Sequence, residues 1–316
     1  MNPSKIAVVA LGGNAIADPS SECTIQDQQQ AAYHACEKIM GLLNEGYHLV
    51  ITHGNGPQVG NILIGMEALR HFGIAPSPLD QCVAMTQGSL GYLLENNLGN
   101  VLADQGKSIR VISLLTEVEV DKNDPAFQNP VKGVGPLLTQ ERYQLLKNST
   151  DWIFQELPEN KYRRVVPSPK PKNVFIRDII KLLLDQGFVC IAGGGGGIPL
   201  YRDGLHYHPV EAVIDKDLTS ALLARQLEAH ILIIATAVHK VCIHFKKPNQ
   251  KELDSISLPE LDQYIREGHF GKGDMLPKVM AIREFLEACP KSEAYIVHLN
   301  DLKNFRTAGT CFYHHR

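Results

Sequence analysis

The sequence predicts an α/β protein whose mainly parallel central sheet is covered by helices on both faces, an open three-layer αβα sandwich. Short apolar runs alternate along the chain with longer segments of helical periodicity, which is the order expected of right-handed βαβ units. Runs such as KIAVVAL at 5–11 are apolar at nearly every position, as in strands buried on both faces. The length of 316 residues suits one large domain or two halves that share a sheet.

Composition excludes several classes of protein. A formal net charge of -3 provides no basic stripe for nucleic acid and no polybasic membrane anchor. The seven cysteines are scattered without a Cys-x-x-Cys pair, which predicts reduced thiols in a cytoplasmic protein. The thirteen histidines show no H-E-x-x-H spacing, so no metal ligand set is expected from the sequence. We therefore expect small-molecule substrates and no membrane or nucleic-acid partner.

Helices and strands alternate along the first third of the chain. The expected strands are 5–11, 47–52 and 108–115, and the expected helices are 24–44, 57–71 and 80–103, the last broken in its middle by small residues. Two glycine-containing loops, Gly12-Gly13-Asn14 and His53-Gly54-Asn55-Gly56, follow the first two strands. Because ligands bind at the carboxyl ends of parallel strands, both loops are candidate ligand contacts.

A different composition begins after residue 117, where proline and glycine recur as far as 172. Such a segment does not suit a helix–strand unit of the core, so we expect a small lobe, about 118–172, that projects over the strand ends. Lys132 and the pair Arg163-Arg164 are its candidate anion contacts, and a solvated surface charge is the alternative for each. A helix over 173–186 is expected to return the chain to the sheet.

The strongest functional signal lies at 188–223. A predicted strand, 188–192, runs into five consecutive glycines, 193–197, and a predicted hairpin near 202–204 is followed by Asp215-Lys216-Asp217 at the start of a helix. Glycine lets the backbone approach an anion closely, and a helix N-terminus attracts negative charge. We interpret this arrangement as a phosphate site; a flexible linker and an ordinary helix N-cap are the alternatives.

A third lysine, Lys278, lies near the start of the last long helix, where its charge opposes the helix dipole. An anion nearby would explain this placement, and a solvated lysine stem is the alternative. The neighbouring expected elements are helices 258–266 and 277–288 and strands 230–236, 241–245, 294–298 and 310–313. Phosphoryl transfer requires positioned cations and amides and no nucleophile–base pair, so it fits a set of three lysines.

Taken together, these motifs resemble carbamate kinases over essentially the whole chain. The resemblance is carried by ALGGNAI at 10, THGNGPQVGN at 52, MTQG at 85, NDPAFQNP at 123, RRVVPSPKP at 163, GGGGIP at 194, VEAVIDKDL at 210 and KPNQK at 247. It implies the amino-acid kinase fold and phosphoryl transfer between ATP and carbamate, with carbamoyl phosphate formed or consumed. It also implies ATP and ADP as substrates, Mg2+ bound through the nucleotide phosphates, a homodimer and a role in arginine metabolism.

The resemblance further implies how residues divide between two halves of one sheet, 1–192 for carbamate and the phosphoryl group and 193–316 for the nucleotide. The implied catalytic residues are Lys132, Lys216 and Lys278, with Asp215 and Asp217 orienting the lysines. The implied substrate contacts are Gly12, Gly13, Asn14, Gly54, Asn55, Gly56, Arg163 and Arg164. The implied nucleotide contacts are Gly194, Gly195, Gly196, Lys216, Thr236, Met275 and Lys278.

Five positions in the second half depart from the sequence that carbamate kinases usually have, one of them Pro209 in place of a glycine. Ala237, Cys242, Asp274 and Leu276 stand in place of an aspartate, a tyrosine, a serine and a glycine. We expect Leu276 to force its loop away from the phosphate and Asp274 to add like charge there. Two alternatives stay open: a working carbamate kinase with altered nucleotide affinity, or a paralogue with impaired ATP use that acts as a binding or partner protein.

Overall fold

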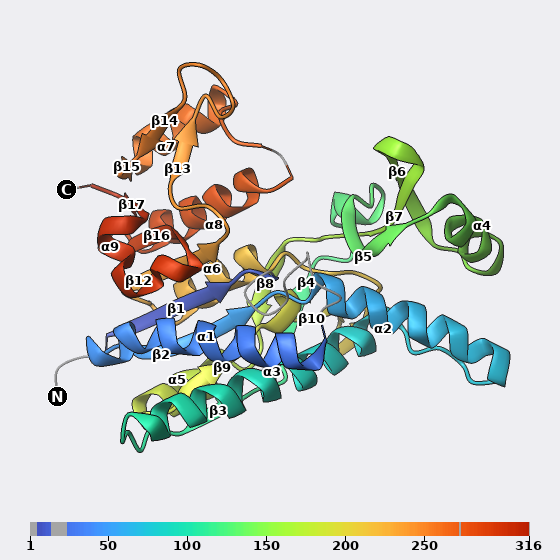
Figure 1. Ribbon diagram of the computed structural model, residues 1–316, viewed down its shortest axis with the longest axis horizontal. Helices are drawn as coiled ribbons and strands as arrows, with labels where there is room; N and C mark the ends of the chain where they lie inside the picture. Colours follow the sequence, from blue (N-terminus) through green and yellow to red (C-terminus); the bar gives the residue numbers. More distant parts are fainter. Residues whose placement is uncertain (1–4, 14–23, 272, 316) are drawn as a thin grey trace.

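An eight-stranded sheet forms the centre of the computed structural model, which describes residues 5–13, 24–271 and 273–315 (Figure 1). The strand order is β15-β17-β16-β12-β1-β2-β9-β3, and β17 is antiparallel to β16 while the other neighbours run parallel. The α/β class and the mainly parallel sheet are therefore confirmed. The strands are β1 (Ile6–Leu11), β2 (His48–His53), β3 (Val111–Ser113), β9 (Val189–Ile191), β12 (Ile231–Thr236), β15 (Ser255–Ser257), β16 (Glu293–His298) and β17 (Thr310–Tyr313).

Helices cover both faces of this sheet and complete the predicted three layers. Strand β1 shows why, because Ile6, Val8 and Ala10 pack into one core while the residues between them pack into the other. A strand buried on both faces must be apolar throughout, which explains the run KIAVVAL. On one face lie α1 (Ile25–Asn44), α3 (Leu79–Asp104) and α9 (Phe305–Ala308), and on the other lie α5 (Arg177–Asp185), α6 (Lys216–Gln226), α7 (Leu258–Arg266) and α8 (Met275–Ala288).

Local sequence fixes the ends of α1. The Thr24 hydroxyl accepts a hydrogen bond from the Asp27 amide at 3.2 Å, and the Asp27 carboxylate accepts one from the Thr24 amide at 2.9 Å. This capping box satisfies two amides that a helix start leaves unpaired. Just beyond the helix, Gly46 adopts a φ of +83°, a left-handed conformation that glycine enters without a Cβ clash. The helix predicted for 24–44 is confirmed.

The long helix α3 differs from its prediction, because it continues unbroken over 26 residues. Its small residues permit close packing instead of interrupting the helix. A Cβ on Gly91 would lie 2.0 Å from the Ser113 hydroxyl oxygen on β3. The predicted break was therefore wrong: a glycine within a helix costs about 1 kcal/mol relative to alanine, and here it lets the helix lie close to the sheet.

The helix predicted for 173–186 is shorter than expected, since its first residues belong to a strand. That strand, β8 (Pro171–Val174), joins β4 (Glu117–Val120), β10 (Ile198–Asp203) and β11 (His206–Pro209) in a second sheet of order β11-β10-β4-β8. Strands β10 and β11 pair antiparallel, which confirms the hairpin near 202–204. Val118 and Val174 of this sheet are buried in the same core as α5 and α6.

A third sheet projects from the main body, to the right in Figure 1. It consists of β5 (Lys132–Leu138), β7 (Lys161–Val166) and β6 (Ile153–Leu157) in that order, beside α4 (Gln140–Ser149). We call these four elements the lobe. The division of the chain into halves 1–192 and 193–316 stays a prediction.

Shorter elements complete the chain. Helix α2 (Gly56–Ala68) follows β2, and β13 (Val241–Ile243) pairs with β14 (Lys251–Leu253) in a two-stranded sheet. The short helix η6 (Leu299–Asn304) follows β16 directly. Within the described ranges, no helix combines the length and apolar character that crossing a membrane requires.

Candidate functional site

Two loops at the carboxyl end of the sheet meet beneath the lobe. Gly12 and Gly13 follow β1, and Gly54 and Asn55 follow β2. The Gly12 amide donates to the Ala235 carbonyl at 3.0 Å, and the Gly54 amide donates to the Leu11 carbonyl at 3.1 Å. A Cβ on Gly54 would lie 3.1 Å from the Gly13 nitrogen, so the absence of a side chain at Gly54 favours the close approach of the two loops. Asn14 lies outside the described residues.

A buried carboxylate gathers two of the three predicted lysines. Lys216 Nζ lies 2.5 Å from Asp217 Oδ1, and Lys278 Nζ lies 3.1 Å from Asp217 Oδ2. Burial on its own raises the pKa of Asp217, but the two lysines outweigh this and lower its pKa to about 2. Burial likewise lowers the pKa of Lys278, whereas Asp217 raises it, and the balance is a pKa above the ordinary value. Both partners are therefore charged at neutral pH.

Lys132 reaches the same place from the lobe. Its Nζ lies 2.5 Å from Asp215 Oδ2. Asp215 is also the N-cap of α6, where its Oδ1 accepts a hydrogen bond from the Asp217 amide at 2.9 Å. Asp215 thus links the first strand of the lobe to the start of α6. The structure brings together all five residues of the implied catalytic set.

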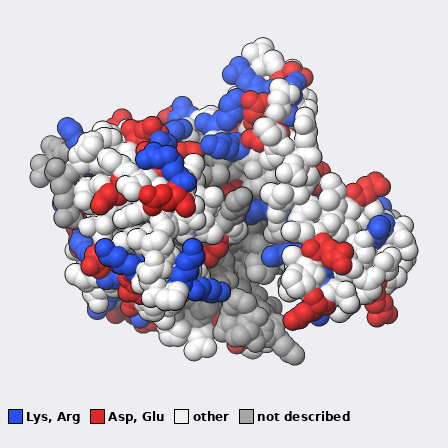
Figure 2. Space-filling model, turned by 90° about the horizontal axis from the view of Figure 1, so that it is seen from above, with Lys and Arg blue, Asp and Glu red and all other residues white. Residues whose placement is uncertain are grey.

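These five residues, which we call the lysine cluster, border two cavities. The lobe-side cavity, of about 250 Å³, is lined by Gly54, Asn55, Gly56 and Lys132 among others. The sheet-side cavity, of about 430 Å³, is lined by Gly12, Thr236, Ala237, His298, Leu299 and Asn300 among others. Gly13, Lys216, Asp274 and Lys278 line both. Figure 2 shows the molecule hollowed between the main body and the lobe, with lysine and arginine side chains at the edges of the hollow.

The five glycines pack mainly against the protein itself. A Cβ on Gly194 would lie 2.4 Å from His53 Nε2, and one on Gly196 would lie 2.2 Å from the Ile214 carbonyl oxygen. Neither glycine lines the two cavities, whereas Gly195 lines the lobe-side cavity. The sequence predicted that the backbone of these glycines lies close to a ligand. At Gly194 and Gly196 the backbone instead lies close to β2 and to the chain just before α6.

Buried polar side chains to which the sequence assigned no role hold this glycine loop and its surroundings, and two of them, Thr86 and Gln87, belong to the MTQG motif. Gln87 Nε2 on α3 donates to the Gly194 carbonyl at 2.9 Å, and the Thr116 hydroxyl accepts from the Gly193 amide at 2.9 Å. Thr86, also on α3, accepts a hydrogen bond from Asn55 Nδ2 at 2.8 Å. The sequence signal that could have pointed to these residues is the presence of polar side chains on the buried side of an apolar helix. Such groups are paired when they are buried, for a structural or functional reason.

The predicted arginines lie elsewhere. Arg164 is only 8 % exposed, stacks over the Trp152 ring at 3.9 Å and lies 3.4 Å from Glu211. It lines a separate cavity of about 700 Å³ beside the lobe, and the Arg163 side chain packs across Gly133. Neither Arg163 nor Arg164 lines the two cavities at the lysine cluster, and their role as substrate contacts stays a prediction. Consecutive residues of a strand point to opposite faces, so Arg163 packs across Gly133 while Arg164 reaches Trp152 and Glu211.

The structure also shows where the residues lie that depart from the usual carbamate kinase sequence in the second half of the chain. Leu276 packs against the core that contains residues of α5 and α6, and Lys278 Nζ donates to Asp217 Oδ2 at 3.1 Å, while the displacement of the loop from the phosphate by Leu276 stays a prediction. Met275 also packs against this core, and neither Met275 nor Cys242 lines the two cavities. Ala237 lines the sheet-side cavity, and Asp274, which lies 3.5 Å from Lys278, lines both.

Buried His53 makes stability depend on pH. Burial lowers its pKa to about 4, opposed by the hydrogen bond to the Gly54 carbonyl and assisted by the charge of Lys216. The unfolded chain therefore takes up a proton at higher pH than the folded chain does. The stability associated with neutral His53 is complete above about pH 6.5 and is lost as the pH falls to 4.

We expect the free energy of unfolding to fall by about 3 kcal/mol over this window because of His53. Urea unfolding at closely spaced pH values measures it. His53→Gln removes the titrating group, so its stability should change less between pH 6.5 and 4 than that of the parent. Parallel pH profiles for the two proteins would contradict the assignment.

Comparisons with known proteins agree with this geometry. The model of the amino acid kinase family matches residues 5–298. The chain is 46 % identical to the carbamate kinase-like protein YahI of Escherichia coli over 90 % of each chain, and 43 % identical to the carbamate kinase of Oenococcus oeni over 96 % of each. The structure of Giardia lamblia carbamate kinase bound to AMP-PNP superposes with a TM-score of 0.90 and 36 % identity over 100 % of both chains. The chain therefore belongs to the amino acid kinase family and, within it, to the carbamate kinases and their like.

Proposed function

We propose that this protein transfers a phosphoryl group between ATP and carbamate, forming or consuming carbamoyl phosphate. The observation that carries the proposal is the lysine cluster at the border of two cavities, with Lys216 and Lys278 lining both. Relatives named carbamate kinase and the likeness to a carbamate kinase bound to AMP-PNP support this choice of substrates.

In this proposal the nucleotide occupies the sheet-side cavity and carbamate the lobe-side cavity. Thr236, Lys216 and Lys278 would contact the nucleotide, and Gly54, Asn55 and Gly56 would contact carbamate. Gly13, which lines both cavities, would offer its amide to the transferred group, while Gly12, whose amide already donates to the Ala235 carbonyl, would let the backbone lie close to that group. Gly195 would contribute backbone from the wall of the lobe-side cavity, while Gly194 and Gly196 would act by holding that wall in place.

The chemistry follows from the charges. A carbamate oxygen forms a bond to the γ-phosphorus while the bond from that phosphorus to the ADP oxygen breaks, and the reverse reaction returns the group to ADP. Lys132, Lys216 and Lys278 neutralise charge on the moving group, and Asp215 and Asp217 hold the ammonium groups in place. The side chains thereby hold both reactants in line without forming a covalent intermediate.

The donor set fits Mg2+ that is held through the nucleotide phosphates. Asp215 and Asp217 already accept contacts from lysines, so phosphate oxygens and water are left as the main ligands. Mg2+ bound in this way supplies further positive charge on the phosphates. We also propose that the protein acts as a homodimer in the cytoplasm, on small molecules of arginine metabolism and without a nucleic-acid partner.

Asp274 provides a test of where the phosphates lie. Its carboxylate is 75 % exposed and lines both cavities, so it would repel a triphosphate. We expect Asp274→Asn to bind AMP-PNP several-fold more tightly in EDTA, a gain on the order of 1 kcal/mol. Calorimetric titration measures it. Asp203→Asn is the matched control, since Asp203 is 64 % exposed and lies 3.7 Å from Lys122, away from both cavities. Unchanged or weaker binding by Asp274→Asn would contradict the proposed phosphate position.

A coupled assay of ATP formation from ADP, Mg2+ and an acyl phosphate tests the reaction. We expect carbamoyl phosphate to support turnover and acetyl phosphate, which lacks the amino group, to do so poorly. The comparisons give no support to the alternative of a paralogue with impaired ATP use. A folded protein that binds ADP but forms no ATP from carbamoyl phosphate would restore that alternative and overturn the proposed function.

A further inference from the structure

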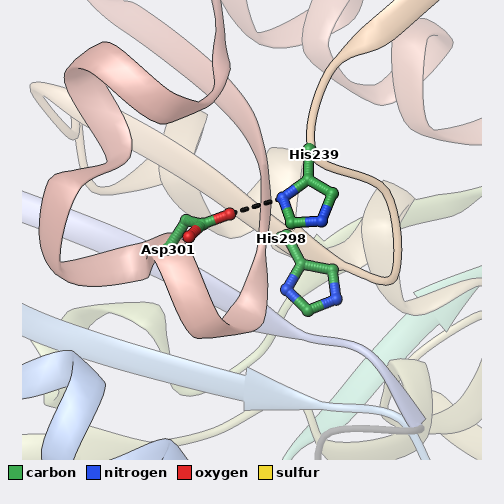
Figure 3. A group of neighbouring side chains, drawn as sticks. All are labelled: His239, His298 and Asp301. Carbon is green, nitrogen blue, oxygen red and sulfur yellow. Dashed lines mark hydrogen bonds and ion pairs between the residues drawn. The ribbon is translucent and has the colours of Figure 1, made fainter.

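Two histidines and an aspartate converge at the carboxyl end of β16, beyond the lysine cluster (Figure 3). His298 is the last residue of β16, Asp301 lies in η6, and His239 lies in the loop between β12 and β13. Each residue offers one nitrogen or oxygen atom, and these atoms lie within 4.8 Å of one another. In the part of the chain that the structure describes, no other three histidine, cysteine, aspartate or glutamate residues group in this way.

The backbone holds the three side chains together before any ligand arrives. His298 is the N-cap of the 3-10 helix η6, and Asp301 lies in the first turn of that helix. His239 Nδ1 lies 2.6 Å from Asp301 Oδ2. The imidazole rings of His239 and His298 stack with centroids 4.5 Å apart and planes 16° apart. Figure 3 shows the Asp301 carboxylate pointing toward His239, with the His298 ring beside it.

An ordinary surface ion pair would explain His239 and Asp301 alone, but not the second imidazole brought to the same point. A set of two imidazoles and one carboxylate is typical of zinc sites that keep a fourth position open. Such a set differs from the all-oxygen surroundings that Mg2+ prefers. We propose that His239, His298 and Asp301 bind a divalent transition-metal ion of the Zn2+, Co2+ or Ni2+ class.

Binding requires only small movements. Ligand atoms lie about 2.0–2.2 Å from a bound zinc ion, so the three side chains must close slightly around it, and His239 must part from Asp301 far enough to admit the ion. The His239 side chain is 67 % exposed and free to move in this way. Ligation by neutral His298 ends the hydrogen bond that its Nδ1 accepts from the Asn300 amide at 3.2 Å, because ligation through Nε2 places the ring proton on Nδ1 and ligation through Nδ1 uses the same lone pair.

The test is metal binding by the untagged, purified full chain in the absence of nucleotide, so that its outcome is independent of the proposed kinase reaction. Zn2+ is titrated calorimetrically, and Co2+ is followed by its visible absorption, which also reveals thiolate ligands in the near ultraviolet. We expect each chain to bind one Zn2+ ion tightly, and we expect that excess Mg2+ does not displace this ion. His239→Gln and Asp301→Asn should each weaken Zn2+ binding by at least about tenfold.

His71→Gln is the matched control, because His71 is an exposed histidine in the short helix after α2, and its Zn2+ affinity should equal that of the parent. Circular dichroism and thermal unfolding establish that each variant is folded. A parent protein that takes up no Zn2+, binding unchanged in both site variants, or a cobalt spectrum dominated by thiolate would each overturn the proposal.

Discussion

Replacing Lys216 with alanine is expected to lower kcat for ATP formation from carbamoyl phosphate about 100-fold or more. The Lys216 ammonium is 13 % exposed, lies 2.5 Å from Asp217 and lines both cavities, so its charge is placed where the phosphoryl group would pass. A donor positioned in advance and shielded from water stabilises the transition state more strongly than the bound substrates. Steady-state kinetics at saturating ADP and carbamoyl phosphate measures the change.

Lys181→Ala is the control for this prediction. Lys181 lies on α5, is 44 % exposed and lies 3.0 Å from Asp185 in a surface pair, so its loss should leave kcat unchanged. Thermal unfolding of Lys216→Ala must also be measured, because the variant leaves buried Asp217 with Lys278 as its remaining cation. A folded Lys216→Ala protein that retains more than about one third of the parent kcat would contradict the role assigned to this lysine.

The glycine loop carries the largest predicted effect on stability. We expect Gly196→Ala to lower the free energy of unfolding by about 3–5 kcal/mol, because strain at positive φ and overpacking add. Gly196 has a φ of +89°, and a Cβ there would lie 2.2 Å from the Ile214 carbonyl oxygen. A backbone atom cannot move aside as a flexible side chain does, so the loop or the start of α6 must shift. Chemical denaturation gives the change.

Gly204→Ala separates the two causes. Gly204 lies in the β10–β11 turn with a φ of +61°, and a Cβ there would meet nothing within 4 Å. This variant should show the conformational strain alone, about 1–2 kcal/mol. If both variants lose the same stability, the close contact with Ile214 has no energetic weight and the proposed support of the site by Gly196 is wrong.

Much of the fold could be predicted because the decisive information is local. The apolar run of β1, the capping box of Thr24 and Asp27, and the start of α6 at Asp215 each depend on a few neighbouring residues. The break expected in α3 was wrong because the role of Gly91 is set by Ser113, a partner on another element. A sequence pattern records which residues are small but not what packs against them.

The candidate site likewise has some features that the sequence could predict and others that it could not. The glycine loops and the three lysines could be expected to meet because parallel strands end at one edge of a sheet, and the structure places Lys132, Lys216 and Lys278 together. Arg163 and Arg164 could not be placed, because their directions depend on the pairing of β7 with β5 and β6. His239 and Asp301 are 62 residues apart, so their contact leaves no motif in the sequence.

The most direct test of the central claim is to watch the phosphoryl group itself by 31P NMR. Purified protein is mixed with ADP, Mg2+ and carbamoyl phosphate, and the spectra are corrected for the spontaneous breakdown of carbamoyl phosphate. The proposed function predicts that the carbamoyl phosphate resonance is replaced by the γ-phosphate resonance of ATP in the parent, and far more slowly in folded Lys216→Ala. Equal rates in the two proteins, or inorganic phosphate as the parent's product, would contradict transfer at the lysine cluster.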